Sequence, residues 1–145
     1  MAAGASSSVI PADDKVLDTP MDYGSVRALG ADLGSASVIV IDDTVPLDWV
    51  VSKTLRFFKH ESCGKCTPCR EGTYWMRQII GRIEDGRAGQ ADVELLHTVA
   101  RQMQNRCLCP LGEFSTMAPV TAIERFPDDF QRAVTRDLTP AERVG

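Results

Sequence analysis

The sequence of 145 residues has no long apolar run, no excess of basic residues and no recognisable export signal. No stretch approaches the roughly 18 consecutive apolar residues that a membrane-spanning helix needs, so we expect no span. A formal net charge of −4 argues against nucleic-acid binding, because that affinity depends on basic side chains that neutralise phosphates. The start of the chain lacks the basic and apolar regions of a secretory signal, which predicts an intracellular protein.

What is present is the composition of an ordinary folded protein, with 43% hydrophobic and 25% charged residues. A chain of this length forms one compact domain, or one domain and part of a neighbour. The five cysteines are an odd number, so they cannot all pair in disulfides. In a reducing compartment, clustered cysteines are more typical of metal ligands than of disulfides.

Residues 1–43 contain one predicted helix and one predicted strand. Spaced apolar residues over 21–33 predict the helix, with Asp22 as its N-cap and Gly34 as its stop. The β-branched run over residues 36–43 predicts a buried strand. These elements are too few to bury both faces of a sheet, so we interpret this segment as the end of a larger α+β unit.

Residues 44–134 carry four amphipathic patterns, which predict a small four-helix bundle. Asp43 or Thr44 is expected to cap the first helix, which runs to His60. The second helix is expected to start near Thr67, and the core candidates of these two helices are Leu47, Val50, Val51, Leu55, Phe58, Trp75, Ile79 and Ile83.

The third helix opens after Gly89, and in the fourth Pro119 is expected to limit where the helix can begin. The core candidates of these helices are Val93, Leu96, Ala100, Met103, Val120, Ile123, Phe126 and Phe130. A polar tail over 135–145 is expected to fray. The predicted fold class is therefore mainly α, a four-helix bundle preceded by a partial α+β segment.

Three of the cysteines form a strict C-x2-C-x2-C run at Cys63, Cys66 and Cys69, and Cys107 and Cys109 follow about forty residues later. A triplet joined to one distant cysteine favours a [4Fe–4S] cluster, in which each thiolate binds one iron corner. The fourth ligand stays open on chemistry alone. Cys109 precedes a proline, as cluster ligands often do, whereas the alternative to a ligand role for Cys107 is a half-buried free thiol.

The residues around the triplet suit such a cluster. Gly64 and Gly72 leave room for close approach of the backbone. Lys65 and Arg70 place positive charge beside a group that four thiolates make negative, which raises its reduction potential. The alternative is a structural zinc site with four cysteines, although such sites more often use two separated C-x2-C pairs.

The stretch from His60 to Gly72, followed by Trp75 and Met76, closely resembles the cluster motif of the NADH-binding flavoprotein subunit of respiratory complex I. Flavoprotein subunits of NAD-reducing hydrogenases and NAD-dependent formate dehydrogenases share that motif. Residues 109–113, Cys-Pro-Leu-Gly-Glu, are similar to the family's Cys-Ala-Leu-Gly-Asp, whose cysteine is the fourth ligand. The resemblance therefore implies that the cluster and metal ligands are Cys63, Cys66, Cys69 and Cys109.

Residues 21–23 and 34–42 resemble the last part of the family's β-grasp (SLBB) domain. The resemblance covers about residues 5–130. It implies a division of the chain into a C-terminal remnant of the SLBB domain, a [4Fe–4S]-binding helical bundle and a tail, over residues 1–43, 44–134 and 135–145 respectively.

In that family, NADH reduces FMN, and the flavin passes electrons singly to this cluster and on to further iron–sulfur centres towards quinone. The resemblance implies a place in an NADH dehydrogenase complex, in a peripheral arm on the cytoplasmic, inner face of the membrane. Its implied partners are a thioredoxin-like [2Fe–2S] subunit and a multi-cluster iron–sulfur subunit. The same relay in an NAD-linked hydrogenase or formate dehydrogenase stays open as an alternative.

The family's glycine-rich NADH/FMN domain precedes everything in this sequence, which contains no G-x-G-x-x-G motif. We therefore expect this chain to hold the relay cluster but to bind neither NADH nor FMN. Electron transfer requires no proton-transfer residue here, so we assign no catalytic acid or base. On this interpretation the chain alone does not oxidise NADH.

Overall fold

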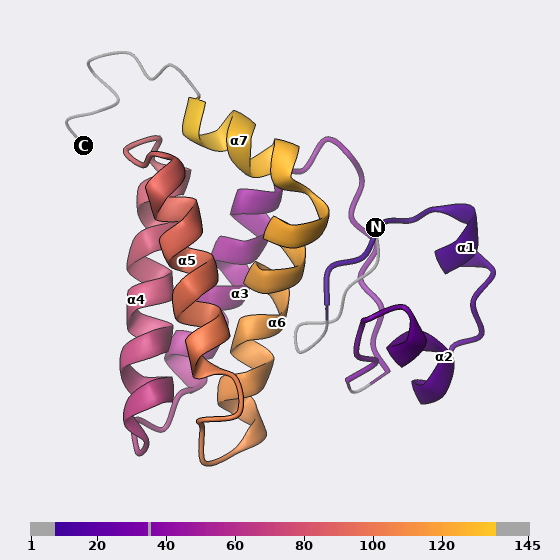
Figure 1. Cartoon of the computed structure of the whole chain (residues 1–145), viewed down its shortest axis with the longest axis horizontal. Helices are drawn as coiled ribbons and strands as arrows, with labels where there is room; N and C mark the ends of the chain where they lie inside the picture. The colour runs from indigo at the N-terminus through magenta and orange to yellow at the C-terminus, as the bar shows by residue number, and fades with distance from the viewer. Residues whose placement is uncertain (1–7, 35, 136–145) are drawn as a thin grey trace.

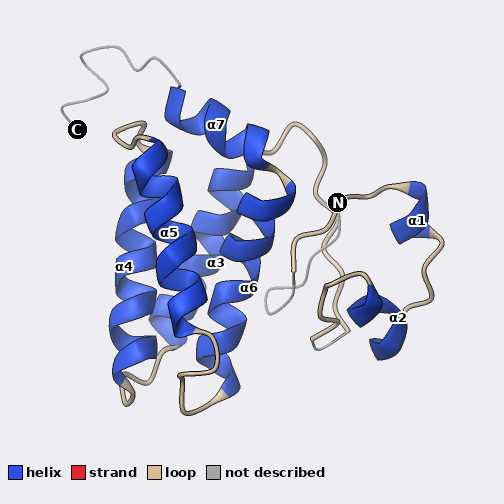
Figure 2. Ribbon diagram, in the orientation of Figure 1, coloured by secondary structure: helices blue, strands red, loops and turns tan. Residues whose placement is uncertain are grey.

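The computed structural model describes residues 8–34 and 36–135, and within them the regular elements are all helices (Figures 1 and 2). They are α1 (Asp14–Leu17), α2 (Tyr23–Ala28), α3 (Leu47–Glu61), α4 (Thr67–Glu84), α5 (Gln90–Met103), α6 (Pro110–Arg125) and α7 (Pro127–Thr135). No helix among the described residues has both the length and the apolar character needed to cross a bilayer.

The four long helices α3–α6 pack side by side and alternate in direction (Figure 1). The short helix α7 crosses one end of this bundle, and α1 and α2 lie beside the bundle. The predicted mainly α fold with a four-helix bundle is confirmed. The division into three parts at residues 43 and 134 stays a prediction, and the tail from residue 136 lies outside the described residues.

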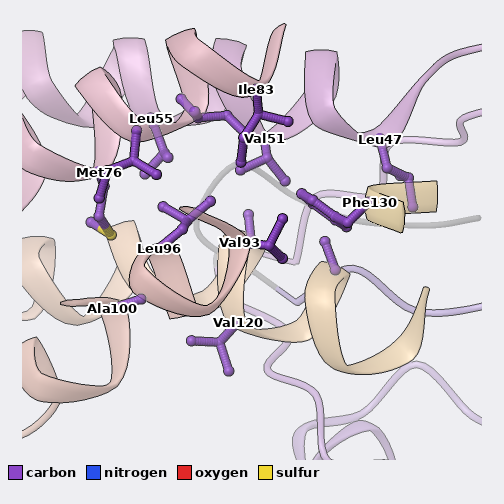
Figure 3. Packing of buried hydrophobic residues seen from close by; sticks show 14 of the residues in the cluster. Leu47, Val51, Leu55, Met76, Ile83, Val93, Leu96, Ala100, Val120 and Phe130 are labelled. Carbon is purple, nitrogen blue, oxygen red and sulfur yellow. The ribbon is translucent and has the colours of Figure 1, made fainter. Parts of the chain in front are cut away.

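The core runs through the middle of the bundle, where apolar side chains from α3 to α7 meet (Figure 3). The predicted face of α5 is confirmed, because each of its candidates is buried: Val93, Leu96, Ala100 and Met103. On α4 one prediction is wrong. Trp75 is 53% exposed and the neighbouring Met76 is fully buried, so the buried face is displaced by one residue at this turn.

The start of α3 differs from the prediction. Its first residue is Leu47, and Pro46 occupies the N-cap position instead of Asp43 or Thr44. The side chain of Asp42 accepts a hydrogen bond from the Thr44 amide at 2.8 Å, which holds this stretch in a turn. The polar residues before Pro46 therefore form the approach to the helix and not its cap.

Pro119 lies inside α6, so the expectation that it limits the start of the helix is wrong. An interior proline removes one backbone hydrogen bond and strains the preceding turn, at a cost of about 3 kcal/mol. The Pro119 ring is fully buried, which offsets part of this cost. The helix instead ends at Arg125, and Pro127 begins α7, which carries the buried Phe130.

The strand predicted over residues 36–43 is not formed. Within the described residues the backbone makes single β-bridges at Ile10 and Val40 and no ladder. Val38, Ile39 and Val40 are 48%, 50% and 80% exposed. A strand is stabilised by neighbouring strands, and the described part of the chain supplies none to this segment.

Two contacts attach the N-terminal segment to α6. The Val9 amide donates a hydrogen bond to Thr121 Oγ1 at 2.8 Å, and both residues are buried. The Arg125 guanidinium donates to the carbonyl oxygens of Leu29 and Gly30 at 2.8 and 2.9 Å, just after α2 ends. The predicted N-cap of α2 is confirmed, since the Asp22 side chain accepts the Ser25 amide.

Candidate iron–sulfur site

Both cysteine loops lie at the same end of the bundle. The loop from Ser62 to Cys66 joins α3 to α4, and residues 104–109 join α5 to α6. Because consecutive helices alternate in direction, these two loops meet at one end, while the α4–α5 turn lies at the other (Figure 1). The topology therefore brings the triplet close to the downstream cysteines.

The triplet spans the transition from loop to helix. Gly64 follows Cys63 with a φ of +74°, a left-handed conformation that glycine adopts without strain. Cys66 is the N-cap residue of α4, and Cys69 sits in its first turn with 5% exposure. Cys63, in contrast, is exposed. The three cysteines of this short stretch therefore differ in solvent exposure, from exposed Cys63 through half-buried Cys66 to buried Cys69.

Arg70 fixes the loop of the triplet. Its Nη1 donates to the Gly64 carbonyl oxygen at 2.9 Å, and its Nε donates to Glu71 Oε1 at 2.8 Å. A longer contact of 3.4 Å joins Nη2 to Thr67 Oγ1. Arg70 therefore links the first turn of α4 to the turn at Gly64, in addition to placing positive charge beside the triplet.

The second loop places Cys109 at the N-cap of α6, with Pro110 as the first helical residue. Cys109 is exposed, whereas Cys107 is half-buried and donates from Sγ to the Met103 carbonyl oxygen at 3.6 Å. The Asn105 amide also bonds to the Glu113 carboxylate, which ties the loop back onto α6. The Cys107 side chain thus bonds to the end of α5 and also has a hydrogen bond with Cys66.

Gly112 lies where the start of α6 packs against Cys107. A Cβ atom at this position would lie 2.3 Å from Cys107 Sγ and 3.5 Å from Cys69 Cβ. Gly72 plays the corresponding role on α4, where a Cβ would lie 2.2 Å from Met103 Sδ. Only glycine fits at these points without displacing a neighbour, so the start of α6 packs tightly against Cys107 and α4 packs tightly against Met103 of α5.

The electrostatics of the triplet differ from one sulfur to the next. The backbone amide of Leu108, followed by that of Cys69, lowers the pKa of Cys66. Burial raises the pKa of Cys69, an effect that the Ser62 hydroxyl opposes; negative charges on Cys66, Cys109 and Cys63 raise it further. Cys69 therefore senses the charge of all three other predicted ligands.

Cys107 is the least favourable thiolate of the group. Burial raises its pKa to about 11, and negative charge on Cys66 and Cys69 adds to this effect. It is therefore a neutral thiol near pH 7, in agreement with its hydrogen bond to the backbone. Cys66, in contrast, has a lowered pKa and occupies the N-terminus of α4, where the helix dipole favours a thiolate.

The donor set fits a cubane cluster in its chemistry and its packing. The four cysteines are thiolate-forming side chains, two of them lie at helix N-termini, and Cys66, Cys109 and Cys63 lie near enough to Cys69 for their charges to act on it. Among the described residues, no three His, Cys, Asp or Glu side chains converge closely enough to hold one metal ion. A cubane does not need such convergence, since each thiolate binds a different iron atom.

Two residues at the site were not identified from the sequence. Ser62 lies 3.3 Å from Cys69 through its Oγ, and Gly112 provides the close packing described above. The position of Ser62 directly before the triplet was the available signal for the first. For Gly112 it was the three-residue spacing from Cys109, which places both in the first turn of one helix.

An antiparallel helical bundle with a cysteine triplet and a Cys-Pro pair at one end belongs to the class of helical iron–sulfur domains. Residues 49–133 match the family described as the NADH-ubiquinone oxidoreductase-F iron–sulfur binding region. The chain belongs to this family.

Relatives of known name are similar over most of the chain. The F subunit of NADH-quinone oxidoreductase from Mycobacterium bovis is 37% identical over 127 residues, which are 88% of this chain and 28% of that protein. The NADH-quinone oxidoreductase F 2 subunit of Rhizobium meliloti is 39% identical over 127 residues, or 88% of this chain and 30% of the relative. The chain therefore spans less than a third of the length of these relatives.

A solved structure has the same fold. The NAD+-reducing [NiFe]-hydrogenase in its air-oxidised state matches 96% of this chain and 24% of its own chain, with a TM-score of 0.79 and 30% sequence identity. The helical arrangement of this chain is thus shared with an NAD+-reducing [NiFe]-hydrogenase.

Proposed function

We propose that this chain is a one-electron relay that holds a [4Fe–4S] cluster on Cys63, Cys66, Cys69 and Cys109. The observation that carries the proposal is that the bundle brings the triplet and the Cys109 loop together at one end. Membership in an iron–sulfur binding family supports it. The cluster would supply reversible one-electron chemistry, and the chain's own residues would hold and tune it.

Each residue contributes in a defined way. The amides of Leu108 and Cys69 stabilise negative charge on Cys66, and Cys109 is the N-cap residue of α6. Arg70 holds the turn at Gly64 in place and adds positive charge nearby. Cys69 would hold the cluster from a buried position, and Cys63 and Cys109 would hold it from exposed positions.

The proposal extends to a larger machine. In it, the complete subunit carries FMN and oxidises NADH, and this domain accepts single electrons from the reduced flavin for further iron–sulfur centres towards quinone. The names of the relatives, which are F subunits of NADH-quinone oxidoreductase, support this context. Its partners would be a thioredoxin-like [2Fe–2S] subunit and a multi-cluster subunit, in a peripheral arm on the cytoplasmic face of the membrane.

The second candidate context is an NAD-linked hydrogenase or formate dehydrogenase. The structural similarity to the NAD+-reducing [NiFe]-hydrogenase favours it, because it extends over nearly the whole chain. The role of the cysteines is the same in both contexts, and the partner subunits distinguish them. Affinity purification of the chain from its native cells, followed by identification of hydrogenase or quinone-linked subunits, would decide between them.

The test of the relay is anaerobic reconstitution of the full chain with iron and sulfide. We expect a brown protein with about four irons per chain and broad visible absorbance that bleaches on reduction. A colourless protein that binds one zinc ion and no iron would refute the relay and establish the structural zinc module instead.

Single substitutions test the ligand set. Cys109→Ser is expected to lose or degrade the cluster, because it removes one of the four thiolates. Cys107→Ser is the matched control two residues away, and it should retain full iron content because Cys107 is a half-buried neutral thiol. Iron retention in the Cys109 variant with loss in the Cys107 variant would show that the fourth ligand is Cys107.

A further inference from the structure

The Ser62 hydroxyl is held against the most buried of the proposed ligands. Ser62 ends α3 as its C-cap residue, and its amide donates to the Phe58 carbonyl oxygen at 3.0 Å. This bond fixes the Ser62 backbone relative to the helix. Its Oγ lies 3.3 Å from Cys69 Sγ, across the loop that joins α3 to α4.

The protonation state of Cys69 determines which of the two atoms donates. The Gly64 amide points at Ser62 Oγ from 3.4 Å, so the hydroxyl oxygen is already an acceptor there. That oxygen can accept a second bond, so with a neutral Cys69 thiol either atom can be the donor. When Cys69 is a thiolate it carries no proton, and the bond can run only from Ser62 to sulfur.

Burial increases the effect of this bond. Cys69 is 5% exposed, so its sulfur exchanges few hydrogen bonds with water. A donor in such surroundings interacts more strongly than one at the surface. The other hydroxyl beside Cys69 belongs to Thr73, and it donates to the Cys69 carbonyl oxygen at 2.7 Å and not to the sulfur.

We propose that Ser62 is a positioning residue that raises the reduction potential of the cluster by donating a hydrogen bond to the Cys69 thiolate. A donated hydrogen bond withdraws charge from the sulfur, and this stabilises the reduced cluster, which is more negative than the oxidised one. The inference rests on the proposed [4Fe–4S] function and adds to it a residue outside the ligand set.

The test is a redox titration of the reconstituted full chain, followed by electron paramagnetic resonance of the reduced cluster. Ser62→Ala removes the hydroxyl and should shift the midpoint potential to a more negative value with iron content unchanged. Ser62→Thr retains a hydroxyl and should restore a potential near that of the original chain. The matched control is Thr67→Ala, which removes a neighbouring exposed hydroxyl bonded to Arg70 and should leave the potential unshifted.

Each remaining outcome decides against the inference. An unchanged potential in Ser62→Ala with full iron content would overturn it, as would an equal shift in Thr67→Ala. Ser62→Gly is included because it also lacks the hydroxyl. Failure of both the Ala and Gly variants to hold iron, with retention in Ser62→Thr, would assign Ser62 a role in assembly and not in tuning. Failure of the original chain to bind iron would instead refute the proposed function itself.

Discussion

The packing at Gly112 gives the sharpest test of the structure. Gly112→Ala adds one methyl group to the first turn of α6, where it would lie 2.3 Å from Cys107 Sγ and 2.7 Å from Cys107 Cβ. Both distances are far below van der Waals contact, so α6 or the Cys107 loop must shift. The added methyl group would also lie 3.5 Å from Cys69 Cβ, in ordinary van der Waals contact.

The expected magnitude combines two opposing terms. Replacing glycine with alanine inside a helix stabilises by about 0.5–1 kcal/mol. Overpacking a tight site destabilises by about 1–3 kcal/mol, and here the clash includes a Cβ atom that cannot rotate away. The net change should be a loss of roughly 1–2 kcal/mol in the free energy of unfolding. The same shift should move Cys109, three residues away, and lower iron content.

The assay is urea unfolding of the metal-free chain followed by circular dichroism, with iron measured separately after reconstitution. Gly81→Ala on α4 is the matched control, because its Cβ would meet only the end of the Arg77 side chain at 2.9 Å. That variant should gain about 0.5–1 kcal/mol. Cys107→Ala in the Gly112→Ala background removes the nearest clashing atom and should recover part of the loss. Equal stability of the Gly112→Ala and Gly81→Ala variants would refute the packing argument.

Two further predictions concern the bundle. Leu55→Ala should lower the free energy of unfolding by about 2–5 kcal/mol in urea titrations, because Leu55 is fully buried, whereas Leu95→Ala at a 46% exposed position should cost well under half as much; equal losses would contradict the assigned core. The hydrogen bond from Arg82 is the main cause that lowers the pKa of Asp92, and the Gly89 amide adds to this effect. The contribution of Asp92 to stability is therefore present above the ordinary carboxyl pKa and is lost as the pH falls through the lowered pKa. Asp92→Asn should therefore reduce the difference in urea midpoint between pH 7 and pH 3, and an unaltered difference would show that other groups dominate.

The elements that sequence predicted well are those whose signals are local. The buried face of α5 was predicted from apolar residues that recur at helical spacing after Gly89, and all four predicted core residues are buried. The start of α4 at Thr67 follows from the proline at its second position. The order of the helices explains why the triplet loop and the downstream cysteines lie at the same end, since an up-and-down bundle leaves few other arrangements.

The failures share a dependence on distant contacts. The β-branched run at residues 38–40 has the composition of a strand, but pairing partners and not composition decide whether a ladder forms. Pro119 normally ends a helix, and only its full burial in the bundle makes the interior position tolerable. The roles of Ser62 and Gly112 depend on contacts with atoms of other elements, and the sequence alone does not show which atoms lie nearby.

The position of Cys69 and Cys109 at the starts of α4 and α6 has a consequence for the energetics of the unfolded chain. Nearly all of α4 and the whole of α5 lie between them, so a group bonded to both closes a ring of about 40 residues. By the polymer estimate used for cross-links, a ring of that size removes unfolded-state entropy worth about 4 kcal/mol. The bonds that would carry electrons would also restrain the chain, so oxidative loss of the metal and weakening of the helical hairpin are expected as a single event.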